Sequence, residues 1–437
     1  MPGEHIVFEP AYCTGCTQCV KACPTRAIRV RRRKAVHSKD LCIGCGECIR
    51  VCPEGAVRST ISHGIPQDLA EMAVAIVSPI LYAQFPGVMP SDILVALKRF
   101  GFHHVVDLTN YVEMFQFAVE EFIHQNKTTG QAPWPLISPI CPVIARLIAF
   151  KYPNLLPHII PLKRPAALIG GEIRSQLQNI YHIEKPLIEL YHITPCPSKA
   201  LAHDVRLLDE LGYIDRAIGI NDIYPELIRY VEDVRKQDLD LFSPEHYGNV
   251  TNARAPLWGM SGGEIAGMHV DKTLAVSGLR ESIAYIEKIE MGLFPNMEYI
   301  ELRACPEGCL GGPLTAVDRY LAKSTVQQLI RSLGLKRRLP REKLLKLYDQ
   351  GRFMSDTHPS VMAERYDSLR PKMTIEIMKR VEHLLSRIQG TDCAACGAPD
   401  CRTFAEDVVR GQADPRDCFR LREKGIASEV DKIEISG

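Results

Sequence analysis

The central part of the chain, from about residue 65 to residue 335, alternates between short apolar segments and longer amphipathic ones. Stretches such as Pro90–Phe100 and Val112–His124 place apolar side chains at helical spacing. Five short apolar runs predict buried strands: Ala73–Val77, Val105–Val106, Ala167–Ile169, Thr273–Val276 and Met297–Glu301. This alternation predicts an α/β domain with largely parallel strands. Residues 341–389 are rich in Leu, Lys, Arg and Glu at helical spacing and predict further helices.

Composition places the chain among ordinary globular proteins. Its 437 residues exceed one ordinary core, and 46% of them are hydrophobic and 24% charged. The net charge of +1 favours neither a nucleic-acid partner nor an anionic membrane surface. The basic runs Arg31–Lys34 and Lys336–Arg338 are short, so we expect solvated loops or partner contacts there.

No targeting or membrane-spanning segment is expected. Residues Met1–Ala11 lack the apolar stretch of a secretory signal. The longest apolar stretch, Leu136–Phe150, is interrupted by Pro139, Pro142 and Arg146 and is too short to span a bilayer. We therefore expect a cytoplasmic protein. In a reducing compartment its sixteen cysteines are expected to bind metal rather than to form disulfides.

Eight cysteines near the N-terminus form two runs with the spacing C-x2-C-x2-C-x3-C-P. This is the spacing of bacterial two-cluster ferredoxins, in which the fourth cysteine of each run binds the other cluster. A zinc module would instead show two separated pairs of ligands. The expected ligands of one 4Fe–4S cluster, site A, are Cys13, Cys16, Cys19 and Cys52; those of the other, site B, are Cys42, Cys45, Cys48 and Cys23.

Four cysteines near the C-terminus have the spacing C-x2-C-x4-C-x16-C. Two close ligands on a loop with Gly and Pro, and a distant fourth, suit one 4Fe–4S cluster, with zinc as the alternative. The pattern resembles the small four-cysteine iron–sulfur domain that is attached to many redox proteins. These four residues are called the C-terminal site: Cys393, Cys396, Cys401 and Cys418.

The other four cysteines are spread through the middle and are called the central site: Cys141, Cys196, Cys305 and Cys309. Taken singly, each would be read as a buried core thiol. Their surrounding segments, Ser138–Pro142, Thr194–Lys199 and Glu301–Gly312, resemble the three signature segments of the catalytic domain of iron-only (FeFe) hydrogenases, in the same order. The segments Val77–Pro79, Ser261–Gly263 and Val276–Leu279 also fit that family. The resemblance covers roughly residues 65 to 330, and the N-terminal ferredoxin fits it too.

The resemblance implies a role for each cysteine of the central site. In that family the four thiolates hold a 4Fe–4S cubane, and one of them also bridges to a diiron unit that carries CO and cyanide. Cys141, Cys196 and Cys305 match cubane ligands, and Cys309 matches the bridging thiolate. Lys199 matches the lysine that binds a cyanide, for which a cationic ammonium is a suitable partner. The backbone of Ser78 and Pro79 matches the wall near the other cyanide, as cofactor-binding positions.

The chain departs from the family where protons would move. Active members have a cysteine before the first ligand and a glutamate six residues after the second; here these relay positions are Ile140 and Ala202. Neither side chain can carry a proton. Two methionines of the family are replaced by Thr194 and Arg303, and Pro313 interrupts the glycine run after Cys309. Four carboxylates near the landmarks are expected to be structural or surface groups rather than relays: Glu172, Glu264, Glu301 and Glu307.

We expect three domains. Residues 1–62 form an α+β bacterial-type two-cluster ferredoxin, residues 63–340 an α/β hydrogenase-like domain, and residues 341–437 a helical segment and a small, mostly α, four-cysteine iron–sulfur domain.

Two functions fit this organisation. One is an iron–sulfur electron-transfer subunit that relays electrons to other redox subunits or to ferredoxin, within a multisubunit complex. The other is a divergent, oxygen-sensitive FeFe hydrogenase with a complete H-cluster, or a hydrogen sensor built on the same site. Whether the diiron unit is present decides between an enzyme and a carrier.

Overall fold

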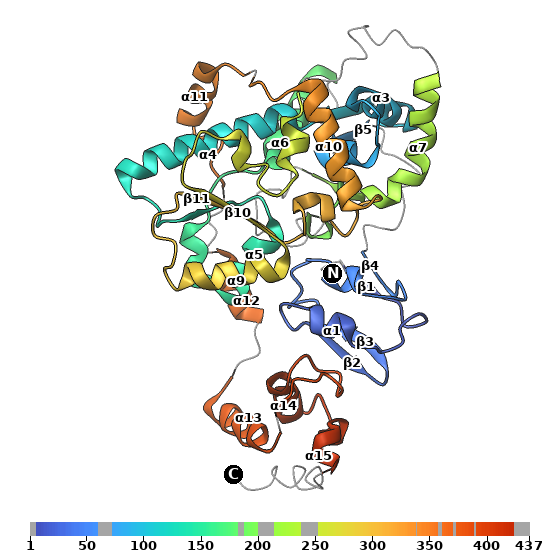
Figure 1. The fold of residues 1–437 in the computed structure, drawn as a ribbon, viewed down its shortest axis with the longest axis vertical. Coiled ribbons are helices and arrows are strands. Elements are labelled where there is room, and N and C mark those ends of the chain that lie inside the picture. The colour runs from blue at the N-terminus through green and yellow to red at the C-terminus, as the bar shows by residue number, and fades with distance from the viewer. Residues whose placement is uncertain are drawn as a thin grey trace. The chain divides into compact units, whose positions relative to one another are not determined.

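The computed structural model describes residues 6–59, 72–181, 188–199, 214–236, 252–337, 339–356, 361–369, 373–388 and 390–423. The chain forms two compact units. The central unit contains residues 60–364, and the cluster unit combines residues 6–59 with residues 365–437 (Figure 1). In the described part of the chain, every helix is too short or too polar to cross a bilayer.

The central unit contains a parallel sheet with the strand order β6-β5-β8-β9. Its strands are β5 (Met72–Val77), β6 (His104–Asp107), β8 (Ile188–Thr194) and β9 (Arg216–Gly219). The strand β5 reads Met-Ala-Val-Ala-Ile-Val and is apolar on both faces, as expected for a parallel strand with helices on either side.

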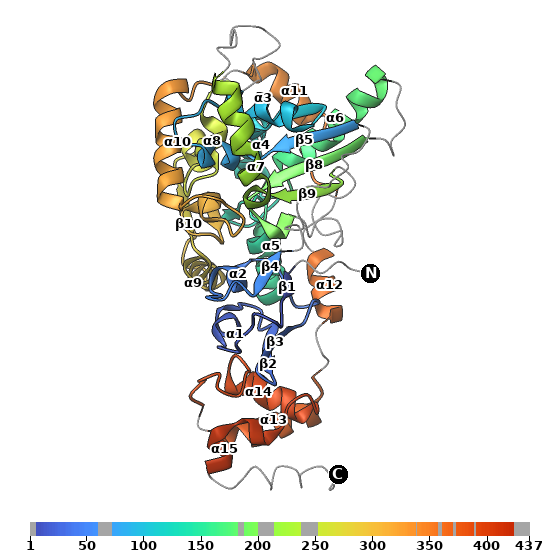
Figure 2. The same ribbon diagram turned by 90° about the vertical axis from the view of Figure 1, so that its right-hand side faces the viewer.

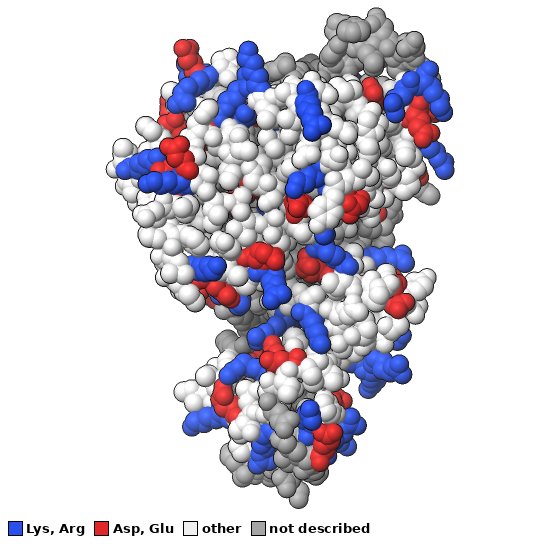
Figure 3. Space-filling view, viewed as in Figure 1, with Lys and Arg blue, Asp and Glu red and all other residues white. Residues whose placement is uncertain are grey.

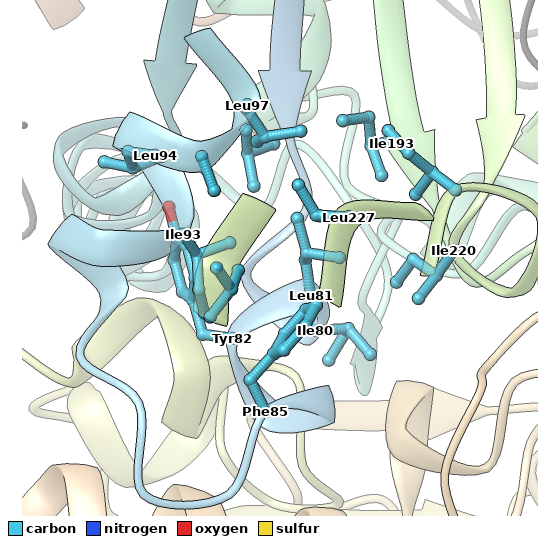
Figure 4. Close-up of a cluster of buried hydrophobic side chains, with 14 of the residues drawn as sticks. Ile80, Leu81, Tyr82, Phe85, Ile93, Leu94, Leu97, Ile193, Ile220 and Leu227 are labelled. Carbon is cyan, nitrogen blue, oxygen red and sulfur yellow. The ribbon is translucent and has the colours of Figure 1, made fainter. Parts of the chain in front are cut away.

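Alternate residues of β5 enter two different cores. Ala73, Ala75 and Val77 pack against helices α3 (Pro90–Phe100), α7 (Ile220–Lys236) and α10 (Arg319–Leu333). Figure 4 shows Leu94, Leu97, Ile193 and Leu227 in this core. Val74 and Ile76 face the other side, where α4 (Thr109–Thr129) and α6 (Pro165–Tyr181) pack. The period of two along the strand thus separates the two layers of helices.

A second parallel sheet in this unit has the strand order β10-β11-β7. It consists of β10 (Thr273–Ser277), β11 (Tyr299–Arg303) and the very short β7 (Leu136–Ile137). Helix α9 (Leu279–Glu290) packs on β10 and β11, and the unit also contains α5 (Pro142–Lys151) and α8 (Arg254–Trp258). Two 3-10 turns, η2 (Pro79–Gln84) and η7 (Gly308–Gly311), follow β5 and β11 along the chain.

The predicted strand at Ala167–Ile169 is wrong, because these residues lie in α6. Pro165 begins this helix, and the fixed backbone of proline suits that position. Apolar contacts then recur at Ala166, Ile169, Ile173 and Leu177, which is helical spacing. The three-residue window was too short to show this period.

Helix α11 (Arg341–Asp349) belongs to the central unit. Leu344 and Tyr348 of α11 enter the same core as α4. Helix α12 (Val361–Leu369) spans the point where the chain passes to the cluster unit.

The cluster unit begins with two small antiparallel pairs of strands. Strand β1 (Ile6–Phe8) pairs with β4 (Val57–Ser59), and β2 (Ile28–Arg31) pairs with β3 (Lys34–His37). The short helices α1 (Gln18–Ala22) and α2 (Glu47–Arg50) each carry one cysteine of a run. The C-terminal part adds α13 (Ile375–Arg387), α14 (Cys401–Val409) and α15 (Phe419–Glu423) (Figure 2).

Both α13 and α14 begin with a side-chain cap. Thr374 accepts a hydrogen bond from the backbone N–H of Ile377, and Asp400 accepts one from Thr403 at 2.8 Å. On the face drawn in Figure 3, basic and acidic side chains of the described residues are interspersed, in keeping with the net charge of +1.

Candidate iron–sulfur sites

The cluster unit contains two cavities lined by cysteine side chains. Including the part open to solvent, one has about 350 Å³ of space and the other about 340 Å³. The first is lined by all four cysteines of site A, together with Phe8, Val30 and Val57. The second is lined by all four cysteines of site B, together with Ile6, Ile28 and Ile43. Each cavity therefore receives three thiols from one run and the fourth from the other.

Backbone N–H groups donate to the sulfur atoms in a repeated pattern. The N–H of Ala27 lies 3.2 Å from the sulfur of Cys23, and the N–H of Ala56 lies 3.2 Å from that of Cys52. The N–H of Ala35 donates to Cys13 at 3.3 Å. Such donors stabilise negative charge on cluster sulfur and so tune the cluster potential.

Burial makes free thiolates costly at these sites. It raises the pKa of Cys19 to about 11 and raises the pKa of Cys48 well above its usual value, with neighbouring cysteines adding to both effects. A thiolate that is disfavoured in the free protein becomes favourable when a metal accepts its charge.

The structure also brings the C-terminal site together. Cys393 and Cys396 lie on the loop before α14, Cys401 is the first residue of α14, and Cys418 precedes α15. Charges on Cys418 and Cys393 add to the burial that raises the pKa of Cys396 to about 11. The N–H of Cys401 donates to the carboxylate of Asp392 at 2.8 Å, which holds the loop to the helix.

In the described residues, no three His, Cys, Asp or Glu side chains meet closely enough to hold one metal ion. Each thiolate of a cubane binds a different iron atom. A cubane site is therefore a space ringed by thiols, and sites A and B have this form.

The central cysteines follow the carboxyl ends of parallel strands, where α/β proteins commonly bind ligands. Cys141 precedes α5 and follows β7, Cys196 follows β8, Cys305 follows β11, and Cys309 lies in η7. Cys309 lies close enough to Cys141 to raise the pKa of that thiol, and both of them raise the pKa of Cys196. Burial is the larger effect and raises the pKa of Cys196 to about 12, whereas the charge of Lys199 opposes it.

Backbone and buried side-chain contacts hold these segments to one another. Arg146 of α5 is buried and donates to the carbonyl of Ser198 at 3.0 Å. The N–H of Leu314 donates to the carbonyl of Pro195 at 3.1 Å, and the N–H of Cys309 to that of Gly259 at 2.8 Å. Hydrogen bonds therefore hold the loops that carry Cys141, Cys196 and Cys309 to neighbouring segments of the central unit.

Gly308 sets how closely η7 approaches the neighbouring loop. Its φ is +71°, and a Cβ atom there would lie 2.6 Å from the backbone of Met260 and Ser261. Gly308→Ala is expected to lower the free energy of unfolding by about 2–5 kcal/mol, through a left-handed alanine and a backbone clash. Gly292→Ala is the matched control, because its φ is +74° and nothing lies within 4 Å. It should cost only about 1–2 kcal/mol. Urea unfolding measures both, and equal losses would contradict the close contact.

A buried ion network lies beside Cys309. Arg303 is 1% exposed, and its guanidinium contacts Glu264 at 2.8 Å and Glu301 at 3.0 Å. The same guanidinium donates to the sulfur of Cys309 at 3.8 Å and lies over the ring of Trp258, 5.0 Å from its centre. Both carboxylates are fully buried, so the charges of the network are compensated within the protein.

Further hydrogen-bond donors contact the two carboxylates of Glu264 and Glu301. Ser138 donates to Glu264 at 2.9 Å, and Tyr299 donates to the same carboxylate. The backbone N–H groups of Gly262 and Glu264 each donate to Glu301 at 3.2 Å. The landmark Ser261–Gly263 thus supplies backbone donors to the network.

Burial raises the pKa of Glu264 to about 7, while the charge of Arg303 opposes the rise. Burial alone would lower the pKa of Arg303, but Glu301, Cys309 and Glu264 together raise it above its usual value. The guanidinium therefore stays charged at any physiological pH, next to the central thiolates.

The remaining predicted positions are placed as follows. Ser78 and Pro79 are buried at the end of β5, where the N–H of Ser78 donates to the carbonyl of Ile193 at 3.1 Å. Lys199 lies one turn after Cys196, to whose carbonyl its N–H donates at 3.2 Å. Ile140 is buried in an apolar core. Ala202 lies outside the described residues.

The four candidate carboxylates have different surroundings. Glu264 and Glu301 are fully buried in the Arg303 network, so neither is a surface carboxylate. Glu172 accepts a hydrogen bond from Tyr111 at 3.0 Å, and Glu307 pairs with Lys323 at 2.8 Å. The roles of Ser138, Tyr299 and Trp258 were missed. No sequence pattern links these three residues to the network, because they meet it only through tertiary packing.

Three family models match the chain. The model "Iron only hydrogenase large subunit, C-terminal domain" matches residues 71–263 and 229–313, which together span more than half of the chain. A model for a 4Fe-4S dicluster domain matches residues 5–53, and one for an Fe-S cluster domain matches residues 388–419.

Curated relatives are distant. The chain is 25% identical over 308 residues to the cytosolic Fe-S cluster assembly factor narfl of Xenopus tropicalis, covering 57% of this chain and 63% of that protein. It is 22% identical over 261 residues to iron hydrogenase 1 of Clostridium pasteurianum, covering 50% of this chain and 44% of that protein. The cytosolic iron-sulfur assembly component 3 of Bos taurus is 23% identical over 290 residues, covering 55% and 60%. The chain spans less than two thirds of the length of each relative.

Among solved structures, an apo FeFe-hydrogenase HydA1 from Chlamydomonas reinhardtii has a TM-score of 0.47 and 16% sequence identity. It covers 69% of this chain and 95% of that chain. A structure of HydA that concerns stepwise assembly of the H-cluster has a TM-score of 0.46 and 16% identity, covering 68% and 95%.

Proposed function

The chain belongs to the iron-only hydrogenase large-subunit family, and from this premise we propose that it is an electron-transfer subunit rather than a working hydrogenase. Sites A and B and the C-terminal site hold 4Fe–4S clusters that receive and deliver electrons. The central site holds a further cubane. The partners are other redox subunits or ferredoxin, in a cytoplasmic multisubunit complex. The single observation that carries this proposal is the charged Arg303 network against Cys309.

The position of Arg303 suits a carrier. The guanidinium places a fixed positive charge and a hydrogen-bond donor at the sulfur of Cys309. A donor and a positive charge favour the reduced, more negative form of a cluster, so they raise its reduction potential. Cys309 is also the residue that matches the thiolate which, in the family, bridges to the diiron unit. In this chain a buried cation lies at that thiolate.

The proton route is interrupted at two places near this thiolate. Hydrogen chemistry needs a titratable group within hydrogen-bond reach of the reacting centre. Ile140 is apolar and buried where the family has its relay cysteine. Glu264 contacts Arg303, and Arg303 contacts Cys309, so a guanidinium that keeps its protons stands between the acid and the thiolate.

A second candidate is a divergent hydrogenase with a complete H-cluster, or a hydrogen sensor with the same site. One observation favours it: Glu264 has a pKa of about 7, a value that suits proton transfer at neutral pH. Lys199, Ser78 and Pro79 remain at the positions that would hold cyanide ligands of a diiron unit, which would supply the hydrogen chemistry when bound.

The proposal is tested by anaerobic redox titration of the iron-loaded protein, followed by electron paramagnetic resonance. Clusters that reduce and reoxidise reversibly, without hydrogen release, are the expected result. Hydrogen evolution from the reduced protein would favour the second candidate. Transfer of clusters to an apo-ferredoxin would contradict the carrier role in favour of iron–sulfur assembly, which the names of two relatives suggest.

Restoring the family's relay residues separates the two candidates further. In Ile140→Cys combined with Ala202→Glu, hydrogen evolution from reduced methyl viologen should stay at background. The carrier has no hydrogen-producing centre to which the restored relay residues could deliver protons. Each single variant serves as a control for folding and iron content. A rise of about a hundredfold or more, the usual scale of one proton-transfer group, would overturn the carrier role.

A further inference from the structure

The C-terminal site lies directly on strand β2 within the cluster unit. The N–H of Val30 donates to the carbonyl of Gly397 at 2.8 Å. One of the Arg31 guanidinium nitrogens donates to the carbonyl of Cys396 at 3.3 Å. A loop that carries two cysteines of the C-terminal site is thus hydrogen-bonded to an outer strand of the ferredoxin part, more than 360 residues away in the sequence.

Glycine at position 397 permits this approach. Its φ is +79°, and a Cβ atom there would lie 2.0 Å from the carbonyl oxygen of Val30. Any side chain would push the loop away from β2. The contact is therefore as close as two backbones allow.

A partly buried ion network links the same two segments. Asp407 of α14 is 5% exposed and accepts from Arg29 through two atoms, at 2.5 and 3.1 Å. It also accepts from Arg31 at 2.6 Å. Arg26 pairs with Asp400, the cap of α14, at 2.8 Å. Bidentate and buried pairs of this kind fix orientation more strongly than exposed ones. Arg26, Arg29 and Arg31 thus form ion pairs with carboxylates of this chain.

On its other side, β2 reaches site A. Val30 lines the cavity that contains the site A cysteines. Val30 is paired in register with Ala35, whose N–H donates to the sulfur of Cys13 at 3.3 Å. A continuous series of contacts therefore runs from Cys396 through Gly397 and Val30 to the wall of site A.

We propose that the C-terminal cluster exchanges electrons directly with the cluster of site A, across the contact between Gly397 and Val30. One electron leaves a reduced cubane and enters an oxidised one, and no bond or proton is exchanged. The electron comes from a low-potential one-electron donor. This inference rests on the proposed electron-transfer function. It makes the C-terminal cluster and the site A cluster consecutive electron carriers.

The test uses the full iron-loaded chain and the double variant Arg29→Gln with Arg31→Gln, which removes both partners of Asp407. Hydrogen exchange at the Val30 amide should accelerate by at least about tenfold, as expected for losing charge-assisted hydrogen bonds. Spin–spin interaction between the reduced C-terminal cluster and site A should weaken, at unchanged iron content. Arg402→Gln is the matched control, since Arg402 pairs with the exposed Glu382 of α13, inside the C-terminal part. It should change neither readout.

Removing one cluster at a time identifies the partner. Cys16→Ala, which depletes site A, should abolish the spin–spin interaction, whereas Cys45→Ala, which depletes site B, should leave it. The reverse result, or an interaction that survives both variants, would overturn the inference. Failure of the electron-transfer function itself would look different, because the clusters would then not reduce reversibly in the unaltered chain.

Discussion

Replacing Arg303 by methionine, the residue of active family members, is expected to lower the free energy of unfolding by about 3–5 kcal/mol. The substitution leaves Glu264 and Glu301 fully buried without their cation. It also removes the contact with the ring of Trp258. Urea unfolding of the iron-loaded protein, monitored by circular dichroism, measures the loss.

The loss of unfolding free energy in Arg303→Met should depend on pH. Burial raises the pKa of Glu264 to about 7 in the folded protein, against an ordinary value of 4.5. A raised carboxyl pKa contributes stability that is complete below the ordinary value and is lost as the pH rises through 7. Removing Arg303 takes away the charge that opposes this rise. Arg303→Met should therefore be more destabilising at pH 8 than at pH 6.

Two further variants identify the cause. The triple variant Arg303→Met with Glu264→Gln and Glu301→Gln should recover most of the lost stability, because no buried charge is left unpaired. Arg216→Gln removes the exposed pair with Glu189 and should change stability by less than about 1 kcal/mol. If Arg303→Met were as stable as the unaltered protein at pH 8, Arg303 would not be compensating the charges of the two buried carboxylates.

Cys309→Ala is expected to remove about four iron atoms from each chain, because a cubane needs its four thiolates. The signals of the other clusters should persist, since their ligands lie in the cluster unit. Lys199→Met is the matched control, because Lys199 lies next to Cys196 in the same site but donates no sulfur to the cubane. Iron analysis and electron paramagnetic resonance measure both variants.

The control also bears on the diiron unit. In the proposed carrier, Lys199→Met leaves the iron content unchanged, because the central site has no cyanide ligand for the Lys199 ammonium to bind. Iron content that is unchanged in Cys309→Ala would mean that the central site holds no cubane. Loss of two iron atoms in Lys199→Met would instead indicate a diiron unit.

Local patterns predicted much of the fold. The alternating apolar and amphipathic segments predicted an α/β central domain, and the segments around the central cysteines gave its resemblance to FeFe hydrogenases. The spacing of the N-terminal cysteines predicted the ferredoxin-like part, and the matched families confirm both domains. The predicted strands at Ala73–Val77 and Thr273–Val276 are present as β5 and β10. The short window at Ala167–Ile169 failed, because three apolar residues do not distinguish a strand from one turn of a buried helix. Strand β7 has only two residues and carries no recognisable period.

The site was predictable to the extent that its chemistry is local. Close cysteine spacing predicts ligand sets because the loop itself places the thiols. The partners of Arg303 were not predictable in the same way, since Glu264 is 39 residues away and meets it only through tertiary packing. The contact of Arg31 with Cys396 spans 365 residues and leaves no sequence pattern. Such pairs follow from the fold and not from periodicity.

In the proposed carrier, the central site holds a cubane without a diiron unit. The most direct test is infrared spectroscopy of the full chain, prepared anaerobically after exposure to the maturation proteins of FeFe hydrogenases, with iron analysis on the same sample. The account predicts a full complement of cubane iron and no stretching bands of CO or cyanide. Such bands, lost again in Cys309→Ala, would contradict it.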